Sequence, residues 1–402
     1  MARVRGRSYG RSMPSDLRRT AALCAAALLA TLVPPAASAG AAGRPAASLR
    51  QATDALHATG VTGVSARLET GRTVTTARSG TGDLRTGRPV PRDAYIRIGS
   101  TTKTFVATVV LQLADERRLS LDDTVERWLP GVVRGQGNDG RRVTLRQLLQ
   151  HTSGVPDYTG DALPDPTAAG YHEHRLTAYS SLRRVQLAMG HPPAFGPGTG
   201  WQYSNTNYVL AGLVIEAVTG RSWEREVRSR ILRPLRLTGT TAPGDDPRLP
   251  HPHARNYQQF GPGEPLTDTT PAYLPFDGDA DGAMISTAAD TNRFFTALLG
   301  GELLSPARLA EMRRTVPEPE EHGSPPGTRY GLGISWTPLS CGGGYWGHSG
   351  SGFGYLVAPA VTEGARPAAL TVTAHSRPGD QETAELQNKG VGDLVDHALC
   401  TA

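Results

Sequence analysis

The segment that decides the fold is YIRIGSTTKTFVATVVLQL, residues 95–113. Apolar and polar residues alternate over residues 95–98, which predicts a short strand that ends at Gly99. Over residues 101–118 apolar residues recur at the spacing of one helical face, with acidic residues opposite. Ser100 is therefore expected where a strand ends and an amphipathic helix begins. The apolar positions of this helix are Phe105, Val109, Leu111 and Leu113, and the acidic ones are Asp115 and Glu116.

Ser100 and Lys103 form the first candidate catalytic pair. Lysine is rare in this chain, which has only Lys103 and Lys389. Residues three apart on a helix share a face, so the hydroxyl and the ammonium group can reach each other. A serine needs a neighbour that takes its proton, and a lysine can do so when burial and a helix N-terminus lower its pKa. The spacing predicts a serine nucleophile, whose own N–H would stabilise an oxyanion. The alternative is a helix N-cap beside a surface lysine.

The second motif is Tyr203-Ser204-Asn205. A phenol can transfer protons when a cation such as Lys103 lowers its pKa. The asparagine amide offers a donor and an acceptor to a substrate amide. Taken alone, the triplet is equally consistent with a polar turn between helices.

The third motif covers residues 347–352, GHSGSG. Its glycines allow a strand to approach a ligand closely, and His348 can hydrogen-bond the phenol or steer protons. Ser349, Gly350 and Ser351 are the candidate substrate-binding residues, and the Ser351 N–H is a candidate second oxyanion donor. A dinucleotide-binding loop is excluded because the glycine spacing differs and no βαβ unit surrounds it.

In the order of its three motifs, Ser-x-x-Lys, Tyr-Ser-Asn and His-Ser-Gly, the chain resembles the serine β-lactamase and penicillin-binding superfamily. Over about residues 50–400 the chain is similar to the Streptomyces-type secreted D-alanyl-D-alanine carboxypeptidase and its class C relatives. The resemblance implies an α/β fold of the β-lactamase/transpeptidase type, with an antiparallel five-stranded sheet flanked by helices plus an all-helical subdomain. It also rests on LLQHTSG at 148–154, YSNTN at 203–207, YGLG at 330–333 and LSCG at 339–342.

The resemblance also implies roles for the matching residues. Ser100 would form an acyl-enzyme, with Lys103 and Tyr203 handling protons. Asn205 would bind the substrate amide, and His348 would replace the lysine of the Lys-Thr-Gly triplet of β-lactamases.

One position departs from the carboxypeptidase pattern. That relative carries an arginine for the terminal carboxylate shortly after Tyr-Gly-Leu-Gly, where this chain has Ser335 and Trp336. Neither side chain can form a bidentate carboxylate contact. D-specific endopeptidase, amidase or esterase activity is therefore an alternative to carboxypeptidase activity.

Residues 1–39 have the pattern of an export signal. A basic stretch precedes an apolar run at 21–33, and Ala37-Ser38-Ala39 is a small-x-small cleavage site. The run is shorter than the roughly 20 residues that a membrane span needs. We expect cleavage near Ala39 and Gly40 and a secreted protein with no stable membrane anchor.

Charge is concentrated in the same segment. Residues 1–39 hold six arginines and one aspartate, so they account for the net charge of +5. The rest of the chain is close to neutral and offers no basic face for nucleic acid.

Cys341 and Cys400 are the two cysteines that remain after signal cleavage. In an oxidising compartment two thiols favour a disulfide over a metal site, with two buried free thiols as the alternative. The cysteines stand where the carboxypeptidase relative has its disulfide, and the resemblance therefore implies that they pair.

Strand-like segments lie toward both ends of the chain and helix-like segments in the middle. We expect residues 40–402 to form one domain. Its α/β body covers about 48–118 and 286–402, and its helical subdomain covers about 119–285.

No metal or other cofactor is expected. The acidic run Asp277, Asp279 and Asp281 lacks the glutamate that would complete a calcium loop. His151 is interpreted as a structural hydrogen-bonding residue rather than a catalyst.

Together these features predict a serine hydrolase acting on D-Ala-D-Ala-type peptides and reactive with β-lactams. A β-lactamase or esterase of the same fold, or a weakly catalytic binding module for β-lactams or peptidoglycan, are the alternatives. We expect a monomer whose partner is a small peptide or β-lactam substrate, with peptidoglycan as a further candidate.

Overall fold

The computed structural model describes residues 39–319 and 324–402. The predicted export signal therefore lies outside the described residues, apart from Ala39. Residues 40–402 form one compact unit. No helix in the described part of the chain is both long and apolar enough to span a membrane.

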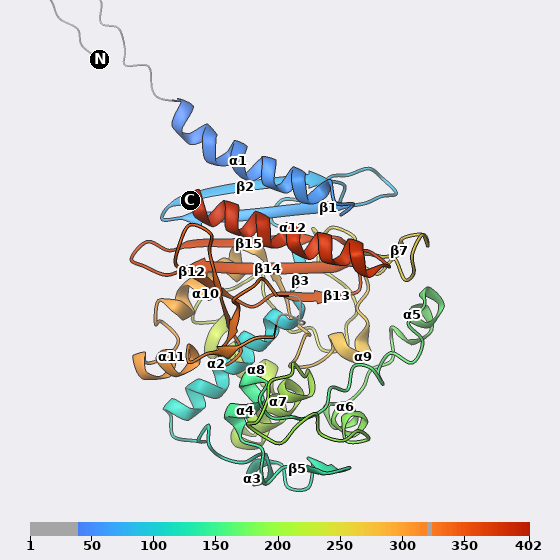
Figure 1. The fold of residues 1–402 in the computed structure, drawn as a ribbon, viewed down its shortest axis with the longest axis vertical. Helices are drawn as coiled ribbons and strands as arrows, with labels where there is room; N and C mark the ends of the chain where they lie inside the picture. Colours follow the sequence, from blue (N-terminus) through green and yellow to red (C-terminus); the bar gives the residue numbers. More distant parts are fainter. Residues whose placement is uncertain (1–38, 320–323) are drawn as a thin grey trace, which may run out of the picture. The chain divides into compact units, whose positions relative to one another are not determined.

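The core of this unit is an antiparallel sheet in the order β2-β1-β15-β14-β12-β11-β10-β9, with β13 paired to β14 (Figure 1). In the described residues this sheet has nine strands where five were expected, because short strands such as β9 and β10 extend it at one edge. The register of β1 on β15 places Ala66 opposite Val372 and Leu68 opposite Leu370. The strands are Gly63–Thr70 (β1), Thr73–Gly80 (β2), Val316–Pro317 (β9), Arg329–Tyr330 (β10), Ser335–Pro338 (β11), Gly344–Gly347 (β12), Gly350–Gly352 (β13), Tyr355–Thr362 (β14) and Ala368–Ala374 (β15).

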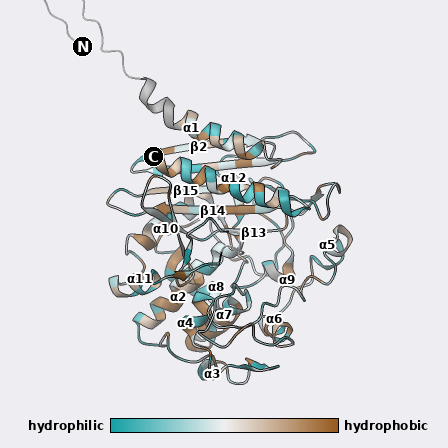
Figure 2. Cartoon of the chain, in the orientation of Figure 1, coloured by the Kyte–Doolittle hydropathy of each residue, from teal (hydrophilic) through white to brown (hydrophobic). Residues whose placement is uncertain are grey.

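Two hydrophobic layers cover the two faces of the sheet. On one face α1 (Ala39–His57) and α12 (Gln381–Cys400) pack their apolar residues onto β1 and β15. On the other face α10 (Ala288–Leu299) packs on β15 and β14 and joins the larger core. Figure 2 shows hydrophobic residues along β14, whereas α12 presents both hydrophobic and hydrophilic residues, as expected for a helix that covers a sheet.

The middle of the chain is mostly helical and also contains short strands. Its antiparallel pair of β3 (Tyr95–Arg97) and β8 (Ile285–Thr287) joins this region to the segment before Ser100. The helices are Val125–Trp128 (α3), Leu145–Gln150 (α4), Ala168–His174 (α5), Ser181–Ala188 (α6), Thr206–Thr219 (α7), Trp223–Val227 (α8), Arg228–Leu232 (η2, a π-helix), Leu274–Asp277 (α9) and, after β8, Pro306–Met312 (α11). The remaining strands are Arg134–Gly135 (β4), Asn138–Asp139 (β5), Thr267–Asp268 (β7), and Tyr257–Gln258 (β6) beside Ser376–Arg377 (β16).

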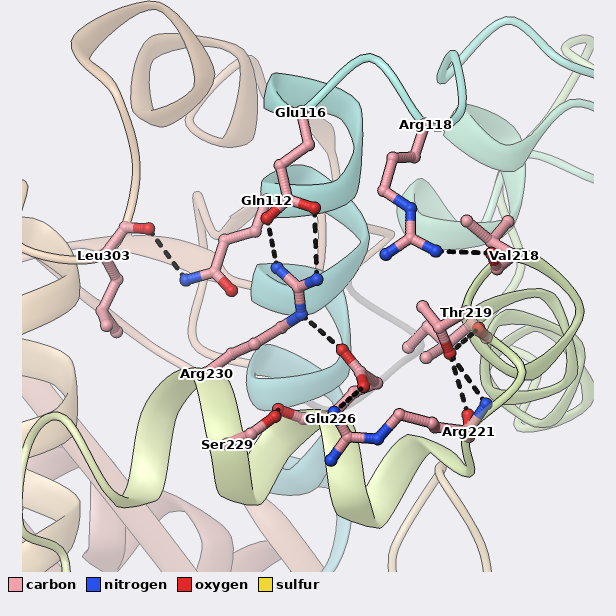
Figure 3. Close-up of polar contacts among 11 residues, drawn as sticks. Gln112, Glu116, Arg118, Val218, Thr219, Arg221, Glu226, Ser229, Arg230 and Leu303 are labelled. Atoms are coloured by element: carbon pink, nitrogen blue, oxygen red, sulfur yellow. Dashed lines mark hydrogen bonds and ion pairs between the residues drawn. The ribbon is translucent and has the colours of Figure 1, made fainter.

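Helix α2 (Thr102–Asp115) runs through the middle of the larger core and is buried on almost every side. Figure 3 shows how its far end is fixed. The Arg230 guanidinium donates to both carboxylate oxygens of Glu116 and to Glu226 of α8. Arg118 donates to the Val218 carbonyl at 2.7 Å. These bonds anchor the C-terminal end of α2 to the neighbouring helices.

The predicted disulfide is present in the structure. Cys341 and Cys400 are joined by an S–S bond and tie the last turn of α12 to the turn between β11 and β12. Ser340 adds to this link by donating from its backbone N–H to Asp396 at 2.7 Å. The bond therefore closes a loop that contains β12 to β15, including the strand with the third motif.

Replacing both cysteines, Cys341→Ser with Cys400→Ser, is expected to lower the free energy of unfolding by about 4 kcal/mol, since closing a loop of this length restricts the unfolded chain. The loop spans a sequence separation of 59 residues. Urea unfolding at equilibrium measures the loss. A decrease of under about 1 kcal/mol would contradict this account.

Candidate active site

Ser100 lies in a single 3-10 turn, η1 (Gly99–Thr101), that leads directly into α2. The chain enters this turn through Gly99, whose φ of 46° is accessible mainly to glycine. The Thr101 hydroxyl then donates to the His348 carbonyl at 2.7 Å. The backbone N–H of Met284 donates to the Thr102 hydroxyl at 3.1 Å. These bonds join the nucleophile turn to the third motif and to the strand of the helical region.

The Lys103 ammonium group makes three hydrogen bonds in the interior. It donates to the Ser100 hydroxyl at 3.0 Å, to the Asn205 side-chain oxygen at 2.7 Å and to the Asp281 backbone carbonyl at 2.7 Å. Lys103 is fully buried, which excludes the alternative of an N-cap beside a surface lysine. The three acceptors fix the nitrogen next to the serine oxygen, as a general base requires.

Burial changes the acid–base behaviour of Lys103. Loss of solvation lowers the pKa of Lys103 to about 8, while the charges of Asp281 and Asp157 act in the opposite direction. Burial also raises the pKa of Asp281 to about 7, against the effect of the Lys103 charge. The neutral amine that can accept a proton is therefore available in mildly alkaline solution.

Tyr203 and Asn205 come from the loop that precedes α7. The Tyr203 phenol hydrogen-bonds Ser100, and the Lys103 nitrogen lies 4.9 Å from its ring centre. Asn205 is oriented by Asp157, which accepts from its backbone N–H at 2.9 Å and from its amide at 3.0 Å. The Asn205 oxygen thereby faces Lys103, and the second motif converges on the first.

The pKa of Tyr203 differs from the sequence-based expectation. A nearby cation was expected to lower it, but burial raises the pKa of Tyr203 well above its usual value, and only the hydrogen bond to Ser100 acts to lower it. The phenol is therefore protonated at neutral pH. In that form it can relay a proton between two neighbours, but it is not a resident phenolate base.

His151 contacts the loop that carries Tyr203 and Asn205, and its contacts are those of a structural hydrogen-bonding residue. It ends α4 in the left-handed conformation, with a φ of 61°. Its Nδ1 accepts from the backbone N–H of Ser204 and from the Asn207 amide, both at 3.1 Å. Its ring lies 4.2 Å from that of Tyr203, centre to centre. His151 therefore packs against the phenol ring and holds the backbone of the Tyr203 loop.

Strand β13 lies against the nucleophile turn with no room for side chains between them. A Cβ atom on Gly350 would lie 1.9 Å from the Ile98 carbonyl oxygen and 2.9 Å from the Ser100 nitrogen. A Cβ atom on Gly99 would lie 2.9 Å from the Ser351 nitrogen. The backbone nitrogens of Ser100 and Ser351 thus lie on adjoining segments, as the two donors of an oxyanion hole must.

His348 and Ser349 precede β13. The Nε2 atom of His348 lies 2.8 Å from the Tyr330 hydroxyl, and its Nδ1 lies 2.8 Å from the Ser349 carbonyl oxygen. The His348 ring centre is 6.3 Å from that of Tyr203. Tyr330, from the Tyr-Gly-Leu-Gly motif, was not singled out as a site residue, yet it is the residue that holds this imidazole.

These residues open into a cavity of about 340 Å³. Ser335, at the position where an arginine was expected, lines it together with Glu318, whose carboxylate hydrogen-bonds Ser324 and Ser335. The structure thus brings together in one cavity wall the predicted residues Ser100, Tyr203, His348, Ser349, Gly350 and Ser351.

Asp281 is the main feature that sequence reasoning missed. It was considered only as part of an incomplete calcium loop, but its backbone carbonyl binds Lys103. Its carboxylate accepts from the Tyr158 hydroxyl at 2.9 Å. The neighbouring Asp279 instead pairs with the buried Arg184 at 3.2 Å. Among the described residues no cluster of His, Cys, Asp or Glu is arranged to hold a metal ion.

The chain matches the family model described as Beta-lactamase over residues 49–389. It is 32% identical over 287 residues to penicillin-binding protein 4 of Amycolatopsis lactamdurans, covering 67% of this chain and 70% of that protein. It is 30% identical over 233 residues to penicillin-binding protein 4* of Bacillus subtilis, covering 55% of this chain. The match spans only 48% of the Bacillus protein, about half its length.

Solved structures give a related result. A D-stereospecific amidohydrolase from Streptomyces sp. is 41% identical with a TM-score of 0.75, covering 84% of this chain and 96% of that one. The D-amino acid amidase of Ochrobactrum anthropi SV3, complexed with L-phenylalanine amide, is 29% identical with a TM-score of 0.76, covering 89% of this chain and 97% of that one. The fold and the site define a serine hydrolase. The chain belongs to the β-lactamase and penicillin-binding protein family.

Replacing Asp281 by asparagine is expected to shift the acid limb of kcat/KM to lower pH by about one unit, because the carboxylate charge holds the pKa of Lys103 up. Hydrolysis of a p-nitrophenyl ester between pH 5 and 10 measures the shift. Asp393→Asn, at an exposed carboxylate of α12, is the control and should leave the limb in place. An unchanged limb in Asp281→Asn would show that this charge does not act on the base.

Gly350→Ala is expected to lower kcat/KM for the same ester at least about 100-fold, since the added methyl group collides with backbone at Ser100 and Ile98. Gly160→Ala is the matched control, because its Cβ would have no neighbour within 4 Å. Circular dichroism checks that both variants fold. Near-normal activity in a folded Gly350→Ala protein would refute the close approach of β13 to the nucleophile.

Proposed function

We propose that this protein is a D-stereospecific hydrolase that cleaves amides, esters or peptides of D-amino acids through an acyl-enzyme on Ser100. The observation that carries the proposal is the buried Lys103 ammonium group 3.0 Å from the Ser100 hydroxyl. In the proposal, Lys103 activates Ser100 as the nucleophile, and the adjacent cavity accommodates the acyl group. We further propose that the protein is secreted, on the pattern of residues 1–39.

In the proposed acylation, neutral Lys103 takes the Ser100 proton, directly or through the Tyr203 phenol. The Ser100 oxygen attacks the substrate carbonyl carbon, and the N–H groups of Ser100 and Ser351 stabilise the oxyanion. When the intermediate collapses, the bond from carbon to the leaving nitrogen or oxygen breaks. The leaving group takes the proton held by Lys103, and water later hydrolyses the acyl-enzyme by the same steps.

The D-amino acid specificity rests on the comparisons. The two structural neighbours with the higher identities are named for D-stereospecific amide hydrolysis, and each is covered over nearly its whole length. Ser335 fits this proposal because it replaces the arginine expected in a strict carboxypeptidase. Glu318 hydrogen-bonds Ser335, so this part of the cavity wall presents a serine and a carboxyl group instead of a guanidinium.

D-Ala-D-Ala carboxypeptidase activity with β-lactam reactivity is the second candidate. It is favoured by the order of the three motifs and by the relatives named as penicillin-binding proteins. Labelling with a fluorescent penicillin distinguishes stable acylation from the rapid turnover expected of a β-lactamase.

The direct test compares D- and L-phenylalanine amide as substrates. We expect the wild type to release ammonia from the D-form, and Ser100→Ala to lose at least about 1,000-fold in kcat, since removing the nucleophile leaves only binding and oxyanion stabilisation. Ser229→Ala, at a half-buried serine of η2, is the control. Equal rates on both enantiomers, or activity that survives in Ser100→Ala, would overturn the proposal.

A further inference from the structure

We call the part of the cavity at Ser100 that is lined by residues of β14, β16 and α12 its second branch, and the proposed chemistry does not use it. Ser351 of β13 is directly opposite Leu356 of β14, so both side chains lie on one face of the sheet. Leu356 packs against the hydrophobic layer that includes α12, whereas Gly350 faces Ile98 on the other side. The cavity therefore passes over β13, from the nucleophile toward α12.

Arg377 lines this branch. It lies in β16, three residues after Ala374, and Ala374 pairs with Leu356 in the sheet. Its side chain is half-buried, and within the described ranges its guanidinium makes no hydrogen bond or ion pair. Burial lowers the pKa of Arg377, and no neighbouring carboxylate opposes that effect. A cation withdrawn from water without a counter-charge is unfavourable, so an anion bound here would be stabilised.

Two other polar side chains, Asn388 and Glu318, line the cavity. Asn388 of α12 lines the same branch, and its amide oxygen is buried without a hydrogen-bond partner among the residues described. Glu318 also lines the cavity, but it hydrogen-bonds Ser324 and Ser335 and does not contribute to the pKa of Arg377. Among the described residues, no carboxylate that lines the cavity pairs with Arg377.

We propose that Arg377, assisted by the Asn388 amide, binds a carboxylate that the substrate carries away from the scissile bond. The planar guanidinium can hold both carboxylate oxygens, and the amide can rotate to donate to one of them. Arg377 of β16 would thus supply the positive charge that is missing at Ser335 of β11. This inference rests on the proposed function and narrows its substrate class to D-configured peptides that carry a carboxylate.

The test uses three forms of one D-Ala-D-Ala dipeptide, all cleaved at the same bond. The first is N-acetylated with a C-terminal amide, the second N-acetylated with a free C-terminal carboxylate, and the third N-succinylated with a C-terminal amide. We expect the wild type to prefer one carboxylate form over the neutral form by roughly tenfold to a hundredfold in kcat/KM, which is the usual contribution of a charged hydrogen-bonded pair. The preferred form shows on which side of the scissile bond the carboxylate lies.

Arg377→Gln should reduce that preference to near parity and leave the neutral dipeptide unaffected, whereas Arg377→Lys should retain part of it. Arg366→Gln, at an exposed arginine between β14 and β15, removes the same charge and should retain all of it. Thermal unfolding checks that the variants are equally stable. A wild type without preference, or a preference that survives in Arg377→Gln, overturns the proposal.

Failure of the proposed function can be distinguished from failure of this inference. If the wild type hydrolyses neither the three peptides nor D-phenylalanine amide, the proposed function fails. Whenever the three peptides are not hydrolysed, their binding is measured instead by calorimetry on the Ser100→Ala protein. A carboxylate peptide should then bind roughly tenfold or more tightly than the neutral one, and lose this advantage when Arg377→Gln is added. Equal binding of all three peptides overturns the anion subsite.

Discussion

The burial of one ammonium group is the constraint on which the rest of the site depends. Lys103 lies in a nearly apolar helix at the centre of the larger core, where a charged amine is stable only if its hydrogens are accepted. Its acceptors come from three separate parts of the chain: the nucleophile turn, the loop before α7 and the segment before β8. Satisfying Lys103 therefore requires the helical region and the α/β body to assemble around it. The same burial lowers the pKa that makes the amine a base.

A second constraint is the contact between two backbones. The nucleophile turn and β13 approach so closely that glycine is required at 99 and 350. Direct backbone contact brings the nitrogens of Ser100 and Ser351 together without flexible side chains. The bond from Thr101 to the His348 carbonyl fixes the same junction. Other motif segments are joined to the helices around the site: Thr104 of α2 donates to the Gly333 carbonyl, and Tyr208 of α7 donates to the Leu149 carbonyl.

The cavity beside Ser100 is lined by charged side chains as well as by the catalytic residues. Glu318, which follows β9, and Arg377 of β16 both line the cavity, although they come from segments far apart in the sequence. Relatives of similar fold are named both as penicillin-binding proteins and as D-amino acid amidases. One fold and one set of motifs thus occur in relatives with different named activities, so in the proposed function substrate choice is assigned to the residues that line the cavity.

The sequence alone predicted the serine, its lysine, the motif order that gives the family, and the disulfide. These are local spacings or matches to a known pattern, and the helical geometry that places Ser100 and Lys103 on one face is independent of the remaining fold. Only the tertiary structure determined the partners and the pKa values of side chains that long-range contacts control. Asp281 has no recognisable spacing to Lys103, and Tyr330 reaches His348 only across the sheet edge. The raised pKa of Tyr203 follows from burial, and only the packed structure shows that Arg377 has no carboxylate partner among the described residues. Solvation and pairing of a charge depend on everything packed around it, which no local segment encodes.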